Sequence, residues 1–195
     1  MMNLEQIRHK LLHCTVGIAG CGGLGSNAAV ALARVGIGKL ILVDFDRVEA
    51  SNLNRQYYFR EQIGQPKVEA LKQNIHAIDP EITVETHMLT LDPEMVVELF
   101  SGCDVIIEAF DTDRAKQMII ETVLTDMPEK YLISGQGLAG FGDNEDITTR
   151  QYDRLFIIGD GLREVSDGLP PLAPRVGVVA NMQANLALEI LLKNE

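Results

Sequence analysis

The chain has 195 residues, of which 46% are hydrophobic and 23% are charged, a composition typical of a globular domain with a core of its own. Its formal net charge of −11 argues against a protein that grips the phosphate backbone of nucleic acid, because that function needs clustered lysines and arginines. No apolar run approaches the length of a membrane span. We therefore expect one domain whose partners include neither nucleic acid nor a membrane.

The cysteines indicate reduced thiols. Cys14, Cys21 and Cys103 form no CxxC pair, and such a sparse, odd set is typical of a cytoplasmic protein. For Cys14 and Cys103, a role as small buried hydrophobic residues is sufficient. Residues 1–12 carry charges among their apolar positions, so they resemble neither a signal peptide nor a membrane span.

The first quarter of the chain predicts helices and strands in alternation. Apolar residues at helical spacing predict a short helix over residues 3–12, and a short apolar run predicts a strand over 14–19. Small apolar residues predict a buried helix over 26–34, which Gly36 ends. A second strand follows over 39–44.

The same alternation continues after a polar loop. We expect helices over 66–78, 93–101 and 112–125, and strands over 82–88, 104–109 and 131–134. The strand over 104–109 is apolar throughout, as in parallel strands buried on both faces. This order predicts an α/β fold with a doubly wound, mostly parallel, Rossmann-like sheet and a ligand at the carboxyl ends of the strands.

The rhythm changes from residue 135 onward. A loop rich in glycine and proline contains one predicted strand over 155–158, and a helix over 175–193 follows it. No repeat or linker divides the chain. We therefore expect one domain over residues 1–195, with a nucleotide-binding core over about 14–134 and a closing part over 135–195.

A cluster of glycines lies between the first strand and the following helix. Gly20, Gly22, Gly23 and Gly25 leave room for a phosphate at the N-terminus of that helix, where the helix dipole favours an anion. Asp44 follows Gly25 by nineteen residues, close to the ~20 expected of an acidic residue that reaches a ribose hydroxyl. The pattern predicts a nucleotide site and is equally compatible with a nicotinamide oxidoreductase.

The segments after Asp44 favour a different class. SNLNRQ at 51–56 and GQPK at 64–67 occur together with GCGGLGSNAA, DVIIEAFD and RVGVVANMQANLALEILL. In this order, and over residues 15–192, these segments resemble the ThiF/MoeB adenylyltransferases, the bacterial relatives of ubiquitin-activating enzymes. The resemblance covers most of the chain, so it is more specific than the glycine cluster alone.

The resemblance implies ATP-dependent adenylylation of a protein carboxylate. In that family the substrate is the C-terminal glycine of a small ubiquitin-like sulfur-carrier protein with a Gly-Gly end, and pyrophosphate is released. We expect the ThiS carrier of thiamine thiazole synthesis, with the small subunit of molybdopterin synthase as the alternative. An α-carboxyl with a pKa of about 3.5 is ionised at neutral pH. The site therefore needs no general base, but it needs cations, N–H groups and a metal that offset the repulsion between anions.

The resemblance also implies three catalytic residues. Arg55 and Lys67 match the family's phosphate-binding arginine and lysine. An arginine offers phosphate a planar guanidinium with paired N–H donors, and a lysine offers a compact positive charge. Outside these motifs, both would be interpreted as exposed solubilising residues. Asp111 matches the aspartate associated with Mg²⁺. The family has Asp-Asn there, whereas this chain has Asp111-Thr112 followed by Asp113, so both aspartates are candidates for the metal and Thr112 is a candidate helix cap.

Further polar residues complete the expected nucleotide site. Asn52 and Gln56 are candidate pocket residues, although an asparagine in a loop often serves the turn itself. Asp46 is a weaker candidate, with a solvated charge at a strand end as its alternative. The expected nucleotide-binding set is Gly20, Gly22, Gly23, Gly25, Asp44, Asp46, Asn52, Arg55, Gln56 and Lys67.

The chain departs from the family in two respects. It has no cysteine after Cys103, so we expect neither the zinc site of many relatives nor the cysteine that takes over the carrier in some of them. Homodimerisation is a family expectation, but only Arg8 and Lys10 are available for the arm that reaches a partner's site, and neither matches it well. The absent cysteine and arm keep a non-catalytic nucleotide-binding module open as an alternative.

Overall fold

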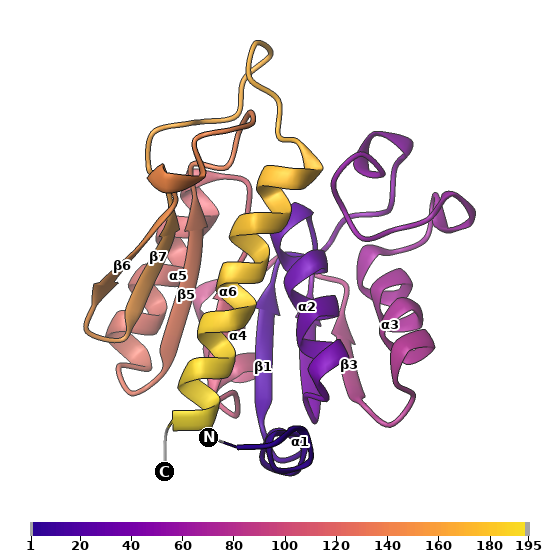
Figure 1. Ribbon diagram of the computed structural model, residues 1–195, viewed down its shortest axis with the longest axis vertical. Coiled ribbons are helices and arrows are strands. Elements are labelled where there is room, and N and C mark those ends of the chain that lie inside the picture. The colour runs from indigo at the N-terminus through magenta and orange to yellow at the C-terminus, as the bar shows by residue number, and fades with distance from the viewer. Residues whose placement is uncertain (1, 194–195) are drawn as a thin grey trace.

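The computed structural model of the protein describes residues 2–193 and contains one seven-stranded sheet (Figure 1). The strands are β1 (Thr15–Ala19), β2 (Lys39–Val43), β3 (Thr83–His87), β4 (Val105–Glu108), β5 (Tyr131–Gln136), β6 (Thr148–Tyr152) and β7 (Leu155–Gly159). Their order is β3-β2-β1-β4-β5-β7-β6, and all neighbours are parallel except β6 and β7. The predicted doubly wound sheet is confirmed. Of the domain expected over 1–195, residues 1 and 194–195 lie outside the described part.

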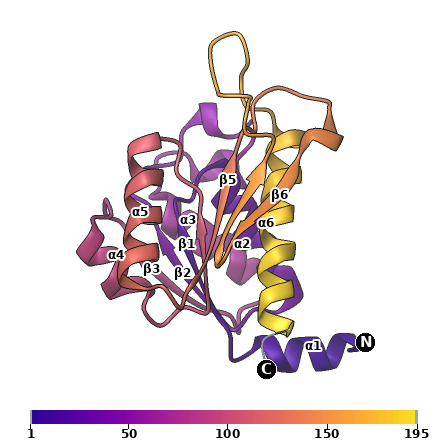
Figure 2. The ribbon, with the colours of Figure 1, turned by 90° about the vertical axis from the view of Figure 1, so that its left-hand side faces the viewer.

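Helices cover both faces of the sheet (Figure 2). They are α1 (Leu4–Leu11), α2 (Gly23–Val35), α3 (Lys67–Ile78), α4 (Pro93–Phe100), α5 (Asp113–Asp126) and α6 (Ala173–Lys193). On one face α2 packs against both α3 and α6, and on the other face α4 packs against α5. Two apolar cores result, one on each side of the sheet, which is the layering expected of an α/β domain.

Local signals in the sequence set most helix ends. Gly36 ends α2 with a φ of 88°, in the left-handed region that favours glycine. The Asp92 side chain caps α4 by accepting from the Met95 amide at 2.8 Å. Two elements differ from the prediction. The helix α2 starts at Gly23, three residues before the predicted residue 26, and the strand β6 was not predicted. All of β6 is exposed at the sheet edge, so it lacks the apolar alternation that identifies a strand.

The strand register brings the chemically interesting segments to one edge of the sheet. Ala19 at the end of β1 pairs with Val43 of β2 and with Glu108 of β4. The residues that follow these three strands therefore leave the sheet side by side, at its carboxyl edge. The strand order reverses between β1 and β4, which is where ligands bind in open α/β sheets.

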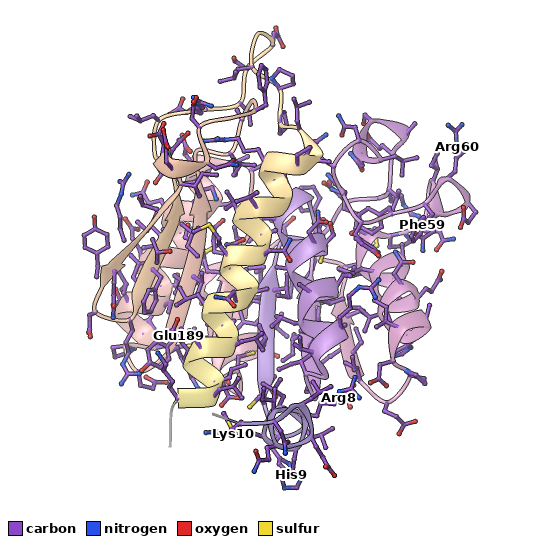
Figure 3. All side chains as sticks on the ribbon, in the orientation of Figure 1. Arg8, His9, Lys10, Phe59, Arg60 and Glu189 are labelled. Carbon is purple, nitrogen blue, oxygen red and sulfur yellow. The ribbon has the colours of Figure 1, made fainter. Side chains whose placement is uncertain are left out.

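The opposite edge of the sheet carries α1 and the end of α6 (Figure 1). Lys10 donates to the carbonyl of Leu192 at 2.9 Å, and the Arg8 side chain packs where a Cβ on Gly36 would lie. Figure 3 labels both side chains at this end of the molecule, so within one chain neither reaches the carboxyl edge. Over residues 2–193, none of the helices has the length and hydrophobicity of a membrane-spanning segment.

Candidate nucleotide site

The glycine turn joins β1 to α2 without side chains in the way. Gly20 has a φ of 94°, and a Cβ there would lie 2.8 Å from the carbonyl oxygen of Ala109 at the end of β4. A Cβ on Gly25 would lie only 1.8 Å from the carbonyl oxygen of Gly20. The Ser26 amide donates to the Gly22 carbonyl at 3.0 Å, and the amides just before it have no acceptor one turn earlier. Those amides form the anion-attracting start of the helix.

Asp44 ties this turn to the end of β2. Its carboxylate accepts from the Cys21 amide at 2.6 Å and from the Asp46 amide at 2.7 Å, and only 9% of the residue is exposed. Burial raises the pKa of Asp44 above its ordinary value, although Lys67 and the two amides act in the opposite direction. Each carboxylate oxygen keeps a further lone pair, so a hydroxyl donor could still be bound.

Lys67 lies next to the turn as the first residue of α3. Its ammonium group pairs with the Asp46 carboxylate at 2.6 Å, and its side chain is only 7% exposed, whereas that of Asp46 is 44% exposed. The Lys67 amide also donates to the Asp46 carbonyl, at 2.9 Å. A buried lysine of this kind is not a solubilising surface residue, so that alternative is wrong for Lys67. Asp46 remains partly solvated at the strand end, as its alternative expected, and is also the partner of Lys67.

The polar loop after β2 is fastened to the glycine turn. The Tyr58 hydroxyl donates to the Cys21 carbonyl at 2.7 Å, and the side-chain Nδ2 of Asn27 donates to the Arg55 carbonyl at 2.9 Å. The Asn52 side chain accepts from the Glu49 amide at 3.0 Å, so its oxygen serves the turn, as the alternative for that residue expected. Arg60, on the outer part of the loop, extends away from the body (Figure 3).

Arg55 and Gln56 lie over the start of α2. The aliphatic part of the Arg55 side chain comes within 3.7 Å of the place where a Cβ on Gly23 would be. The Arg55 guanidinium donates to the Ser51 carbonyl at 3.2 Å and to the side-chain oxygen of Asn54 at 2.8 Å. Gln56 is 9% exposed, and its side-chain oxygen has no hydrogen-bond partner among the described residues. A buried polar atom without a partner is costly, which marks this spot as one that a ligand or water would complete.

Asp111 lies in the turn between β4 and α5, next to the glycine turn. The preceding Ala109 and Phe110 are the residues that a Cβ on Gly20 would touch. Asp111 is exposed and makes no hydrogen bond or ion pair with the described residues, and Asp113 is exposed as the first residue of α5. The Thr112 side chain caps α5, as its alternative expected. Over residues 2–193 no group of three His, Cys, Asp or Glu side chains could hold a metal.

A buried ionic network that was not predicted from the sequence lies beside this turn. Glu108, the last residue of β4, is fully buried and accepts from Lys116 at 2.9 and 3.0 Å and from the Ser134 hydroxyl at 2.5 Å. The signal was present in the sequence, because a glutamate inside an apolar strand requires a partner once the strand is buried. Eight residues separate Glu108 from Lys116, across the turn that contains Asp111.

A second missed pair fixes the loops after β5 and β7. Arg175 in the first turn of α6 pairs with Asp160 at 2.5 Å, and both side chains are 2% exposed. Arg175 also donates to the Gly142 carbonyl. Arg175 therefore connects the loops over 137–147 and 160–172, at the same edge of the sheet as the glycine turn (Figure 1). Arg163 connects the same loops by donating to the Phe141 carbonyl at 3.0 Å.

Comparisons with known proteins agree on one family. The ThiF family model matches residues 3–195. The chain is 31% identical to the molybdopterin-synthase adenylyltransferase of Salmonella typhimurium (strain LT2), over 94% of this chain and 75% of that protein. It is 40% identical to the tRNA threonylcarbamoyladenosine dehydratase of Bacillus subtilis (strain 168), over 68% of this chain and 52% of that protein. It spans half or less of the length of several other curated relatives.

The solved structures agree on the fold. The E. coli tRNA N6-threonylcarbamoyladenosine dehydratase in complex with AMP superposes with a TM-score of 0.86, at 24% identity, over 96% of this chain and 89% of that chain. Likeness at this level of identity concerns the fold. The family model, however, matches nearly the whole chain, in the same segments that carry the glycine turn, the polar loop and the turn after β4. The chain therefore belongs to the ThiF family.

Proposed function

We propose that the protein transfers the adenylyl group of ATP to the C-terminal glycine carboxylate of a small ubiquitin-like sulfur-carrier protein. The observation that carries this proposal is the buried Lys67, whose charge acts on Cys21 and Asp44 at the glycine turn, with the Arg55 stem packed over Gly23. The site thus offers the Lys67 ammonium, the Arg55 guanidinium and the free backbone amides at the start of α2. Together these groups suit a triphosphate. The adenylyltransferase relative supports the same reaction class.

In this reaction a carboxylate oxygen of the carrier attacks the α-phosphorus of ATP. The new bond joins that oxygen to phosphorus, the bond from phosphorus to the bridging oxygen breaks, and pyrophosphate leaves with the electron pair. Lys67 and Arg55 bind the phosphates and offset the charge that builds on the leaving group. The amides at the start of α2 bind phosphate oxygens, and Asp44 accepts from a ribose hydroxyl. The side-chain oxygen of Gln56, which has no partner among the described residues, accepts a hydrogen bond from the nucleotide.

Asp111 would hold Mg²⁺, which supplies charge neutralisation to the phosphates when it is bound. The donor set fits this ion, because Mg²⁺ is commonly held by one or two carboxylates together with phosphates and water, and does not need a cage of three side chains. Asp111 is exposed, without a protein partner among the described residues, and borders the glycine turn through Ala109 and Phe110. We assign the metal to Asp111, which matches the family's aspartate, and Asp113, exposed as the first residue of α5, is the alternative.

The carrier we propose is ThiS, and the small subunit of molybdopterin synthase is the alternative. The Salmonella relative favours the alternative by name, whereas the segment PRVGVVANMQANLALEILL, which resembles ThiF-like proteins, favours ThiS. A homodimer, with ATP and Mg²⁺ bound in each protomer, remains part of the proposal as a family expectation.

The deciding experiment is carrier-dependent exchange of labelled pyrophosphate into ATP in the presence of Mg²⁺. ThiS and the small subunit of molybdopterin synthase would be tested separately, each beside a form that lacks its last glycine. Exchange with one carrier and none with its shortened form would establish the reaction and its substrate. No exchange with any carrier, despite ATP binding, would contradict the proposal and favour a nucleotide-binding module.

An RNA substrate is the second candidate, favoured by the 40% identity to a tRNA-modifying relative. The net charge of −11 opposes it, since binding to a phosphate backbone gains from released counterions only where cations cluster. Total tRNA added to the same exchange assay tests it. Exchange that requires tRNA, and no carrier, would replace the first proposal with this one.

A further inference from the structure

The buried network around Glu108 joins four elements at the carboxyl edge of the sheet. Lys116, on the first turn of α5, donates to both Glu108 oxygens and to the Gly135 carbonyl of β5 at 2.9 Å. Ser134 of β5 donates to Glu108 as well. From α6, the Gln183 side-chain amide donates to the backbone carbonyls of Glu108 and Ile133, at 3.2 and 3.3 Å. The ends of β4 and β5 are thus locked to α5 and α6.

This network also acts on the turn that follows β4. The Phe110 amide donates to the Glu108 carboxylate at 2.7 Å, so the side chain of Glu108 accepts from a residue two positions later. Phe110 immediately precedes Asp111. Its ring and the Ala109 carbonyl also lie against Gly20. The carboxylate therefore fixes the backbone from which Asp111 projects, and fixes it against the glycine turn.

Packing of the fold alone does not require a carboxylate at position 108. Glu108 is fully buried, and replacing a buried ion pair by apolar residues is often neutral or stabilising. A hydrocarbon side chain would fill the strand end equally well but could not accept from Phe110. The cost of burying the charge indicates a role beyond packing.

We propose that Glu108, charge-balanced by Lys116 and oriented by Ser134, is a positioning residue that sets the Ala109–Asp111 turn so that Asp111 meets Mg-ATP. Glu108 touches neither nucleotide nor metal and acts through the Phe110 amide. This inference rests on the proposed function through the role given to Asp111. It names no carrier, so it is tested by nucleotide binding without one.

Two double variants separate positioning from charge burial. Both replace Lys116 by methionine, so neither leaves a buried charge unpaired. Glu108→Gln/Lys116→Met keeps a side-chain oxygen for the Phe110 amide, whereas Glu108→Leu/Lys116→Met removes it. Lys130→Met is the control for loss of one lysine, because Lys130 lies before β5 at the opposite edge of the sheet.

Two quantities would be measured on each folded protein. The first is the exchange rate of the Phe110 amide hydrogen, without any ligand. The second is the magnesium response, defined as the Kd for ATP in EDTA divided by the Kd for ATP in Mg²⁺. In the leucine variant, we expect the Phe110 amide hydrogen to exchange at least about tenfold faster than in wild type. We also expect its magnesium response to be at least about tenfold smaller. A factor of about ten corresponds to the free energy of one hydrogen bond to a charged group. The glutamine variant should stay within about threefold of wild type.

Equal exchange and equal magnesium response in the two double variants would overturn the proposal. If the leucine variant does not fold, Ser134→Ala supplies the comparison. A wild-type magnesium response there would overturn the proposal, and a partial loss would support it. Asp111→Asn separates the two hypotheses: a wild-type response in this variant overturns the role given to Asp111, whereas loss in Asp111→Asn with full retention in the leucine variant overturns only the role of Glu108.

Discussion

At the scale of single residues, the proposed chemistry depends on two cations at the glycine turn. Replacing Arg55 or Lys67 by alanine should lower adenylation by about 10²-fold or more, because a preorganised group that offsets developing charge is lost. Arg60→Ala and Lys72→Ala are matched controls, from the outer part of the same loop and from the same helix. The rate of pyrophosphate exchange at saturating ATP measures the effect. Wild-type rates in both Arg55→Ala and Lys67→Ala would refute their assignment.

Two glycines in helices provide opposite predictions for stability. A Cβ on Gly25 would collide with the Gly20 carbonyl, so Gly25→Ala should lower the free energy of unfolding by about 3 kcal/mol or more. Gly177 in α6 has no atom within 4 Å of its Cβ position, so Gly177→Ala should raise that free energy by about 0.5 to 1 kcal/mol. Urea unfolding of both variants checks this. A stable, ATP-binding Gly25→Ala protein would contradict the account of the turn.

The sequence predicts side chains in motifs better than side chains in networks. The glycine turn and Asp44 could be expected because their spacing reflects local geometry that recurs after a parallel strand, whereas Lys67 was expected from the resemblance of its segment to the family. Glu108 was interpreted as part of an apolar strand, since its partners Lys116 and Ser134 come from α5 and β5 and meet it only in the folded sheet. Asp160 and Arg175 were missed for the same reason, being brought together by the start of α6.

At the scale of elements, helices and buried strands follow from the apolar pattern and from caps such as Asp92 and Gly36. Edge strand β6 does not, because both of its faces are exposed and no apolar alternation marks it. The start of α2 was also placed too late. Glycines usually end helices, but here Gly23 and Gly25 lie in the first turn of one, since a Cβ on Gly25 would meet the Gly20 carbonyl.

The buried ion pair between Asp160 and Arg175 helps to hold the loops after β5 and β7. Asp160→Asn would leave Arg175 buried without a counter-charge, so it should lower the free energy of unfolding by about 3 to 5 kcal/mol at pH 7. Burial alone would raise the pKa of Asp160, but two backbone amides and Arg175 together lower it below its ordinary value. The folded state therefore binds this proton less tightly than the unfolded state does. The stabilisation is complete above about pH 5 and is lost as the pH falls below about 4.

Urea unfolding of wild type and Asp160→Asn at pH 7 and pH 3.5 tests this pair. The difference between the two proteins should shrink at the lower pH, because Asp160 binds a proton there in unfolded wild type, near its ordinary pKa of about 3.9, more readily than in the folded state. Asp153→Asn, an exposed aspartate in the turn between β6 and β7, is the control and should change little. A difference that stays constant across the two pH values would show that the charge of Asp160 is not what holds the loops.

At the scale of the whole molecule, the site is assembled from the ends of three neighbouring strands, so a bound nucleotide should stabilise the entire fold. A ligand at 100 times its Kd adds about 2.7 kcal/mol to the free energy of unfolding, which corresponds to about 5 to 10 °C in Tm for a chain of this size. We expect Mg-ATP to produce such a shift and NAD at the same concentration to produce little. Lys67→Ala should lose most of the shift, whereas Lys72→Ala should keep it. A larger shift with NAD than with ATP would instead favour a nicotinamide oxidoreductase, because the glycine turn and Asp44 alone suit either nucleotide.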